Sequence, residues 1–258
     1  MKAFEARHYL LSAVMQWEKV VDREAYPFAL PVLRGFQQIE FHPKVTFLVG
    51  ENGAGKSTLI EALAVAWGFN AEGGTKNFNF STAAAHSPLH KYLKLVKSPR
   101  RVKDGFFLRA ESYFNVASYI EAMDAIPAPA PPVKNSYGGK SLHNQSHGES
   151  FFALFENRFG GNGLYILDEP EAALSPSGQM SLLTRIHELV DKSSQFIIAT
   201  HSPILMAYPD AWIYQVSAKG LDRIEYKDTE HYQVTRDFLN RTDDMLDVLL
   251  DRNETEQK

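Results

Sequence analysis

Short apolar runs alternate with longer amphipathic stretches over most of the chain. Residues 45–49, 164–167 and 196–199 are almost entirely apolar, which is typical of strands buried on both faces of a sheet. Residues 58–67 and 179–190 have helix-forming side chains or apolar positions at helical spacing. Strands of this kind, separated by helices, predict an α/β fold in which helices cover a mostly parallel central sheet.

Two pairs of runs predict antiparallel hairpins. Residues 37–41 and 45–49 are separated by His42-Pro43-Lys44, and residues 211–226 are interrupted at Lys219-Gly220. The first pair supplies antiparallel strands near the N-terminus. The second pair closes the sheet near the C-terminus.

The middle and the end of the chain have a different composition. Residues 70–105 are rich in Asn, Gly, Ser and Thr and then become basic, which predicts an irregular insertion. We expect a strand at 106–110, a helix that continues through Met123, and another helix at 149–159. An amphipathic C-terminal helix is expected at about 229–251.

The overall composition limits the class of protein. Of the 258 residues, 44% are hydrophobic. This favours a single domain over residues 1–258, although the length alone would also allow two small ones. The absence of cysteine excludes disulfides and thiolate metal sites. A formal charge of −4 gives the whole chain no attraction to nucleic acid or to an anionic membrane. No apolar run reaches membrane-spanning length, which predicts a cytoplasmic protein with no membrane insertion of its own.

A glycine-rich segment follows the first buried run. Residues 50–57, Gly-Glu-Asn-Gly-Ala-Gly-Lys-Ser, fit the P-loop pattern and stand between a predicted strand and a predicted helix. The backbone N–H groups of such a loop surround phosphates, while the lysine reaches the outer phosphates and the serine hydroxyl binds Mg²⁺. A chance glycine-rich turn is the alternative, and the strand and helix on either side disfavour it. The predicted nucleotide-binding residues are Gly50, Glu51, Asn52, Gly53, Ala54, Gly55, Lys56, Ser57 and Thr58.

Two acids follow the buried run at 164–167. Asp168 and Glu169 would emerge at the carboxyl ends of the strands, the edge at which a P-loop sheet binds its ligand. Asp168, with Ser57, is predicted to hold Mg²⁺, and Glu169 to orient or deprotonate the attacking water. Solvated acids at the end of a strand are the ordinary alternative. The P-loop favours the functional interpretation.

A histidine follows the next buried run. His201 would emerge at the same edge and reach the γ-phosphate of a bound nucleotide. A lone histidine after a strand is more often structural or solvated, but the nearby acids and P-loop favour a catalytic role. The predicted catalytic residues are therefore Lys56, Glu169 and His201.

Together these segments resemble the Walker A motif, the Walker B motif and the switch histidine of the ABC ATPases, in the same order. Residues 145–149, Gln-Ser-His-Gly-Glu, resemble the signature motif that such proteins present to the ATP of a partner subunit. A Ser/Gly turn that caps a helix is the alternative. The resemblance implies a P-loop NTPase fold with a helical signature subdomain at about 70–160. It also implies ATP and Mg²⁺ as ligands, contacts of Ser146 and Gly148 with the partner's ATP, and an ATP-dependent head-to-tail homodimer.

The chain also departs from the pattern of this class. Its signature-like segment ends in glutamate, which resembles the chromosome-maintenance (SMC) and repair branch rather than transporter subunits. About ninety residues separate Lys56 from Ser146, too few for the long coiled coil of that branch. The chain therefore resembles a compact, stand-alone ATPase. The class carries a glutamine after the strand near 106–110, but none is present here, and Arg109 or Glu111 could substitute for it.

The resemblance implies Mg²⁺-dependent ATP hydrolysis that switches a dimer between closed and open states. Three roles remain open: a switch in DNA repair or phage defence, the nucleotide-binding subunit of an ABC transporter, and a non-catalytic scaffold. The glutamate-ending signature favours the first role. Glu169 and His201 disfavour the last, so the transporter subunit is the main alternative.

One dense basic segment lies within the predicted insertion. Its first three lysines share a face if the stretch is helical. A solvated surface is the ordinary interpretation, and contact with nucleic-acid phosphate or an acidic partner protein is the alternative. The basic residues are Lys91, Lys94, Lys97, Arg100, Arg101 and Lys103.

Overall fold

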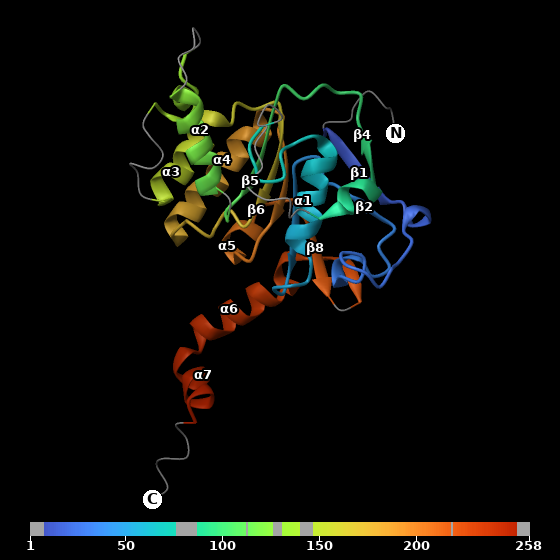
Figure 1. The fold of residues 1–258 in the computed structure, drawn as a ribbon. Helices are drawn as coiled ribbons and strands as arrows, with labels where there is room; N and C mark the ends of the chain where they lie inside the picture. The colour runs from blue at the N-terminus through green and yellow to red at the C-terminus, as the bar shows by residue number, and fades with distance from the viewer. Residues whose placement is uncertain are drawn as a thin grey trace, which may run out of the picture.

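A six-stranded sheet lies at the centre of the molecule (Figure 1). The computed structural model describes residues 8–75, 87–111, 113–125, 131–139, 147–217 and 219–251. The strands of the sheet lie in the order β5-β6-β7-β3-β8-β9, and all neighbours are parallel except the β8-β9 hairpin. Their bounds are β3 Val45–Gly50, β5 Asp104–Arg109, β6 Gly163–Asp168, β7 Gln195–Ala199, β8 Trp212–Ser217 and β9 Gly220–Ile224. The predicted mostly parallel sheet and the C-terminal hairpin are confirmed.

Both faces of this sheet are covered, so β3, β6 and β7 are buried at every residue. Alternate side chains of β3 point to opposite faces: Phe47 packs in the cluster with α2, α3 and α4, whereas Leu48 packs in the cluster with α1. The helices are α1 Lys56–Trp67, α2 Tyr113–Asp124, α3 His147–Ala153, α4 Pro176–Asp191, α5 Pro203–Met206, α6 Glu230–Asn240 and α7 Thr242–Leu249. The π-helix η7 (Leu154–Arg158) continues α3, and the 3-10 helices are η2 Trp17–Lys19, η3 Pro31–Leu33, η4 Pro88–Tyr92, η5 Val133–Tyr137 and η8 Tyr226–Asp228. Within the described ranges, no helix combines the length and apolar character needed to cross a bilayer.

A separate three-stranded antiparallel sheet corrects the predicted N-terminal hairpin. Its order is β2-β1-β4, with bounds β1 Leu10–Met15, β2 Gln38–Glu40 and β4 Leu93–Lys97. Residue Ile39 of β2 pairs with Ala13 of β1, whereas the next strand, β3, joins the central sheet. The two runs differ in burial, because β2 hides only its middle residue and β3 hides every residue. They therefore belong to different layers, and the segment at 42–44 crosses between them.

The predicted irregular insertion at 70–105 is wrong in part. The 3-10 helix η4 and strand β4 lie within it, and β4 pairs with β1 along five register positions from Leu10 to Met15. This strand was not recognised because its alternation is short and carries two lysines. The single domain at 1–258 and its signature subdomain stay predictions.

The C-terminal amphipathic helix is two helices rather than one. Helix α6 ends at Asn240, Arg241 has φ −137° and ψ 46°, and α7 begins at Thr242. Both helices extend away from the two sheets (Figure 1). The start of α6, in contrast, lies next to α5, close to the carboxyl end of β7.

Candidate functional site

The P-loop, residues 50–57, closes tightly between β3 and α1. Gly50 has a φ of 143°, and a Cβ there would lie 2.5 Å from the carbonyl oxygen of Val216 in β8. Gly55 has a φ of 96°, and its Cβ would lie 2.8 Å from Cγ1 of Val32. Both positions require glycine, since a side chain would be strained and would meet atoms packed on either side of the loop.

The Lys56 side chain turns back into this loop. Its Nζ donates to the carbonyl oxygens of Gly50 at 2.7 Å and Glu51 at 2.8 Å, and the residue is 4% exposed. Burial lowers the pKa of Lys56, while the charges of Glu169 and Asp168 oppose the change. The ammonium is therefore held inside a glycine-rich loop at a helix N-terminus, a setting that suits a phosphate group.

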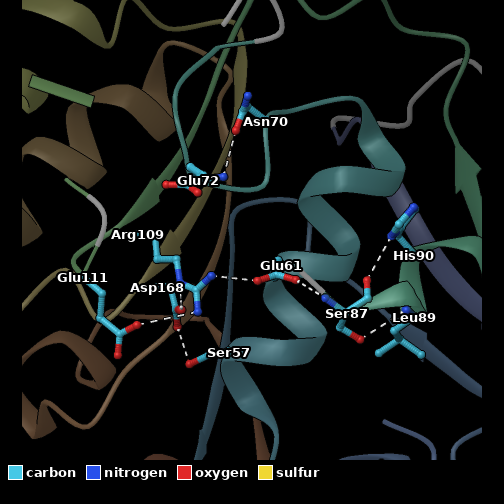
Figure 2. Close-up of polar contacts among 10 residues, drawn as sticks. All are labelled: Ser57, Glu61, Asn70, Glu72, Ser87, Leu89, His90, Arg109, Glu111 and Asp168. Atoms are coloured by element: carbon cyan, nitrogen blue, oxygen red, sulfur yellow. Dashed lines mark hydrogen bonds and ion pairs between the residues drawn. The ribbon is translucent and has the colours of Figure 1, made fainter. Parts of the chain in front are cut away.

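Ser57 and Asp168 meet between α1 and β6 (Figure 2). Ser57 Oγ donates to Asp168 Oδ1 at 3.0 Å. A hydroxyl and a carboxylate are the two protein oxygens that commonly hold Mg²⁺ beside substrate phosphates. In the part of the chain that the structure describes, no three His, Cys, Asp or Glu side chains are grouped as a metal site. Because its two oxygens are in contact, the Ser57–Asp168 pair fits a Mg²⁺ ion that also binds phosphate oxygens.

The Asp168 carboxyl is almost fully buried. Burial raises its pKa to about 7, although the hydrogen bond from Ser57 and the charge of Arg109 oppose the rise. A carboxyl whose pKa is higher in the folded than in the unfolded chain favours folding below pH 4, and this contribution is lost as the pH rises to about 7. Without Mg²⁺ or nucleotide, burial of the ionised Asp168 carboxylate therefore lowers the free energy of unfolding at neutral pH.

Replacement of Asp168 by asparagine should remove that cost. We expect Asp168→Asn to raise the free energy of unfolding at pH 8 by about 2–4 kcal/mol without Mg²⁺ or nucleotide, and to change it little below pH 4. Urea denaturation at both pH values measures the difference, with the exposed Asp222→Asn as control. Equal stability of Asp168→Asn and wild type at pH 8 would contradict the assigned cost of burial.

Arg109, at the end of β5, contacts acids from α1, from β6 and from the turn after β5 (Figure 2). Its Nη1 lies 2.7 Å from Glu61 Oε2 of α1, its Nε 3.9 Å from Asp168 Oδ2, and its Nη2 3.6 Å from Glu111 Oε2. Glu61 is buried and also accepts a hydrogen bond from the Ser87 N–H at 3.0 Å. Arg109 is thus surrounded by acids, whereas Glu111 is 83% exposed. That either residue substitutes for the glutamine of the class stays a prediction. Glu61 was missed from the sequence, although a single acid in an apolar helix was a visible signal.

Loss of Arg109 should leave the Glu61 carboxylate buried without its main cation. We expect Arg109→Met to lower the free energy of unfolding by about 3 kcal/mol. The double variant Glu61→Gln/Arg109→Met keeps an acceptor for Ser87 and removes the charge, so it should recover most of the loss. A double-mutant cycle by chemical denaturation measures the coupling. Additive effects of the two substitutions would mean that the pair is not energetically coupled.

Glu169 and His201 follow the neighbouring strands β6 and β7 and face each other. His201 Nε2 lies 3.6 Å from Glu169 Oε1. Glu169 has a left-handed φ of 51°, and its N–H donates to the Ala199 carbonyl at 2.9 Å. A non-glycine residue in this region is uncommon and is often found at functional sites. The structure thus brings the two side chains together at the edge that holds the P-loop.

Two matching family models cover parts of the chain. The model described as "AAA domain" matches residues 28–111, and the model described as "AAA domain, putative AbiEii toxin, Type IV TA system" matches residues 143–207. Among solved structures, cbiO1 from Clostridium perfringens, described as part of the ABC transporter complex cbiONQ, is 16% identical, with 91% of this chain and 97% of that chain covered and a TM-score of 0.51. The chain has the P-loop ABC-type ATPase fold.

The chain is also similar to the SMC head domain from Thermotoga maritima, which is 20% identical, with 73% of this chain and 93% of that chain covered and a TM-score of 0.39. No curated protein matches the chain in sequence.

Within this ATPase fold, two further side chains support His201. Glu171 Oε1 accepts the His201 backbone N–H at 2.6 Å, and His201 Nδ1 lies 3.0 Å from His231 Nε2. Burial, the charge of Lys56 and the nearby His231 lower the pKa of His201 to about 4, so the ring is neutral at pH 7. Burial raises the pKa of Glu171. Neither Glu171 nor His231 is among the predicted site residues, and no local pattern distinguishes His231.

The signature-like segment is described only in part. Ser146 lies outside the described residues. Gly148 lies in the first turn of α3, where a Cβ would stand 3.3 Å from the Ala173 carbonyl oxygen, so this turn packs closely on the segment that follows β6. The contacts of Ser146 and Gly148 with a partner's ATP stay predictions.

The basic segment does not form the helical face considered for it. Lys94 and Lys97 lie in the strand β4. Lys97 Nζ stands 4.3 Å from the centre of the Trp67 ring, and the Arg100 guanidinium 5.2 Å from that of Tyr9. These cation–π contacts attach the segment to the body of the protein. Its contact with nucleic acid or a partner protein stays a prediction.

Proposed function

We propose that the chain binds ATP with Mg²⁺ and hydrolyses the ATP. The observation that carries this proposal is the meeting of three groups at one sheet edge: the P-loop ammonium, the Ser–Asp pair and the Glu–His pair. They come from the loop after β3, from α1 and from the ends of β6 and β7. This arrangement is the one that phosphoryl transfer requires, since its catalysis consists mainly of positioning and charge stabilisation.

Each residue of the site has its own role in the proposed reaction. Lys56 exchanges its two carbonyl partners for the outer phosphates of ATP. Ser57 and Asp168 would hold Mg²⁺, which would supply positive charge to stabilise the phosphate oxygens. Glu169 accepts a proton from water as the water oxygen bonds to the γ-phosphorus; the bond to the β–γ bridging oxygen breaks, and ADP leaves with that electron pair. His201 donates a hydrogen bond to the γ-phosphate.

Hydrolysis is proposed to need two chains in a head-to-tail homodimer. The support is the resemblance of residues 145–149 to a signature motif, which would bring Ser146 and Gly148 to the ATP of the other chain. ATP would close the dimer, and loss of phosphate would open it. The same two-site geometry makes ATP-dependent dimerisation a measurable consequence.

The proposed role of this cycle is a cytoplasmic switch in DNA repair or phage defence. The glutamate that ends residues 145–149 supports it, and one matched family model is described as a putative AbiEii toxin. The basic segment at 91–103 would contact nucleic acid or an acidic protein. A transporter subunit is the second candidate, because cbiO1 is described as part of a transporter complex. Recovery of a membrane-spanning partner in a pull-down would favour that second role.

Phosphate release by the purified wild-type protein tests the proposed reaction. We expect ATP to be converted to ADP and inorganic phosphate with Mg²⁺ present and not after its removal by EDTA. Nucleotide binding measured in parallel distinguishes a failure to bind ATP from a failure to hydrolyse it. Protein that binds ATP and Mg²⁺ but releases no phosphate under any oligomeric condition would contradict hydrolysis.

A further inference from the structure

His231 makes a direct contact with the predicted catalytic histidine. His201 Nδ1 and His231 Nε2 are 3.0 Å apart, and the ring centres are 5.2 Å apart at an interplanar angle of 56°. His231 belongs to the first turn of α6, the helix that extends away from the sheets (Figure 1). The contact thus joins the C-terminal helices to the nucleotide site.

The start of α6 is fixed in place by its neighbours. Thr229 is fully buried, caps the helix by accepting the Tyr232 N–H at 3.3 Å, and donates to the Tyr226 carbonyl at 2.8 Å. The Tyr226 hydroxyl donates in turn to the carbonyl of Pro203, two residues after His201, at 2.9 Å. His231 is therefore presented to His201 by a turn that is capped by a buried threonine rather than by a freely moving helix end.

Only one of the two nitrogens in this contact carries the hydrogen when both rings are neutral. Burial lowers the pKa of both rings, so both are neutral at pH 7. If His231 donates, the hydrogen of His201 lies on Nε2; if His201 donates, Nε2 carries a lone pair. The His201 Nε2 atom is buried and has no hydrogen-bond partner among the described residues, and Glu169 Oε1 lies 3.6 Å from it. A lone pair facing that carboxylate is unfavourable, whereas an N–H is attracted to it.

We propose that His231 is a positioning residue whose Nε2–H donates to His201 Nδ1 and so holds His201 as the Nε2–H tautomer. The N–H of His201 then faces Glu169 and the nucleotide site. His231 itself touches no predicted nucleotide-binding residue through a described hydrogen bond. The catalytic consequence rests on the proposed ATP hydrolysis, whereas the tautomer of His201 does not.

The effect on catalysis should appear in kcat. Without His231, both tautomers of His201 become accessible and the donor to the γ-phosphate is present only part of the time. We expect His231→Leu to lower kcat for ATP by about fivefold to tenfold, the value of roughly one hydrogen bond, with KM within about twofold of wild type. His231→Gln retains an N–H donor at comparable reach and should restore most of kcat. His187→Gln, on α4 away from the site, is the matched control.

The tautomer is measured on the full chain labelled with ¹⁵N-histidine. Long-range ¹H–¹⁵N spectra at pH 7.5 without nucleotide distinguish the two neutral forms, and the resonance lost in His201→Asn assigns the residue. We expect the Nε2–H form in wild type and in His231→Gln, and a mixture in His231→Leu, with circular dichroism showing that each variant is folded. An Nδ1–H form in wild type, or a His201 pattern that is unchanged in folded His231→Leu, would overturn the proposal. Absence of ATP turnover in wild type would refute the proposed reaction, and the spectra would then decide the role of His231. If His231→Leu fails to fold, the spectra of wild type and of His231→Gln decide that role.

Discussion

Glu169→Gln should bind ATP about as tightly as wild type while its turnover falls by about 10²- to 10⁴-fold. Glutamine keeps the size of the side chain and its hydrogen-bonding reach, but it cannot accept the proton of the attacking water. The Glu169 backbone contact with Ala199 does not depend on the side chain, so the left-handed turn after β6 should persist. The substitution should therefore remove the proton acceptor and leave the backbone of the site unchanged.

Single-turnover phosphate release and fluorescent-nucleotide binding measure the two properties of Glu169→Gln separately. Glu225→Gln, an exposed glutamate beyond β9, is the matched control and should behave as wild type. If Glu169→Gln released phosphate at the wild-type rate, Glu169 would not be the base, and the proton would have to leave by another route.

Lys56→Ala should weaken the binding of ATP by about a hundredfold, since charged hydrogen bonds to the outer phosphates contribute on the order of 2–3 kcal/mol. The variant also loses the two hydrogen bonds from Nζ to the carbonyls of Gly50 and Glu51, so its thermal unfolding must be compared with that of wild type. Lys56→Met retains most of the apolar stem and separates loss of packing from loss of charge.

Isothermal titration with ATP and Mg²⁺ measures this loss. The exposed Lys219→Ala serves as control. If folded Lys56→Ala kept the wild-type ATP affinity and turnover rate, residues 50–57 would not be the nucleotide-binding loop. Together with Glu169→Gln, the result distinguishes a binding defect from a chemical one.

The sequence predicted the parts of the site that follow directly from buried strands. The runs at 45–49, 164–167 and 196–199 are apolar because both faces of the sheet are covered, and parallel strands end at one edge. Any polar residue immediately after such a run must emerge at that edge. For this reason Asp168 and His201 could be placed beside the P-loop without a structure.

Other features depended on pairings between distant segments. The run at 37–41 looked like one arm of a hairpin, but its partner is β1, which precedes it by about 25 residues, and strand pairing of this kind leaves no local signal. The ion pair of Arg109 with Glu61 spans 48 residues, and the contact of His201 with His231 spans 30. Residue types alone could not reveal either contact, because each depends on how whole elements pack.

The mass of Glu169→Gln in solution, measured by light scattering after gel filtration, tests most directly whether two chains share each ATP. We predict a dimer of twice the 29.1 kDa chain with ATP and Mg²⁺, and a monomer with ADP. Adding Ser146→Arg should return the ATP-loaded protein to a monomer, because a bulky cation would meet Mg²⁺ and Lys56 of the other chain. An ATP-loaded Glu169→Gln that stays monomeric, or a dimer that ignores Ser146→Arg, would contradict the head-to-tail arrangement.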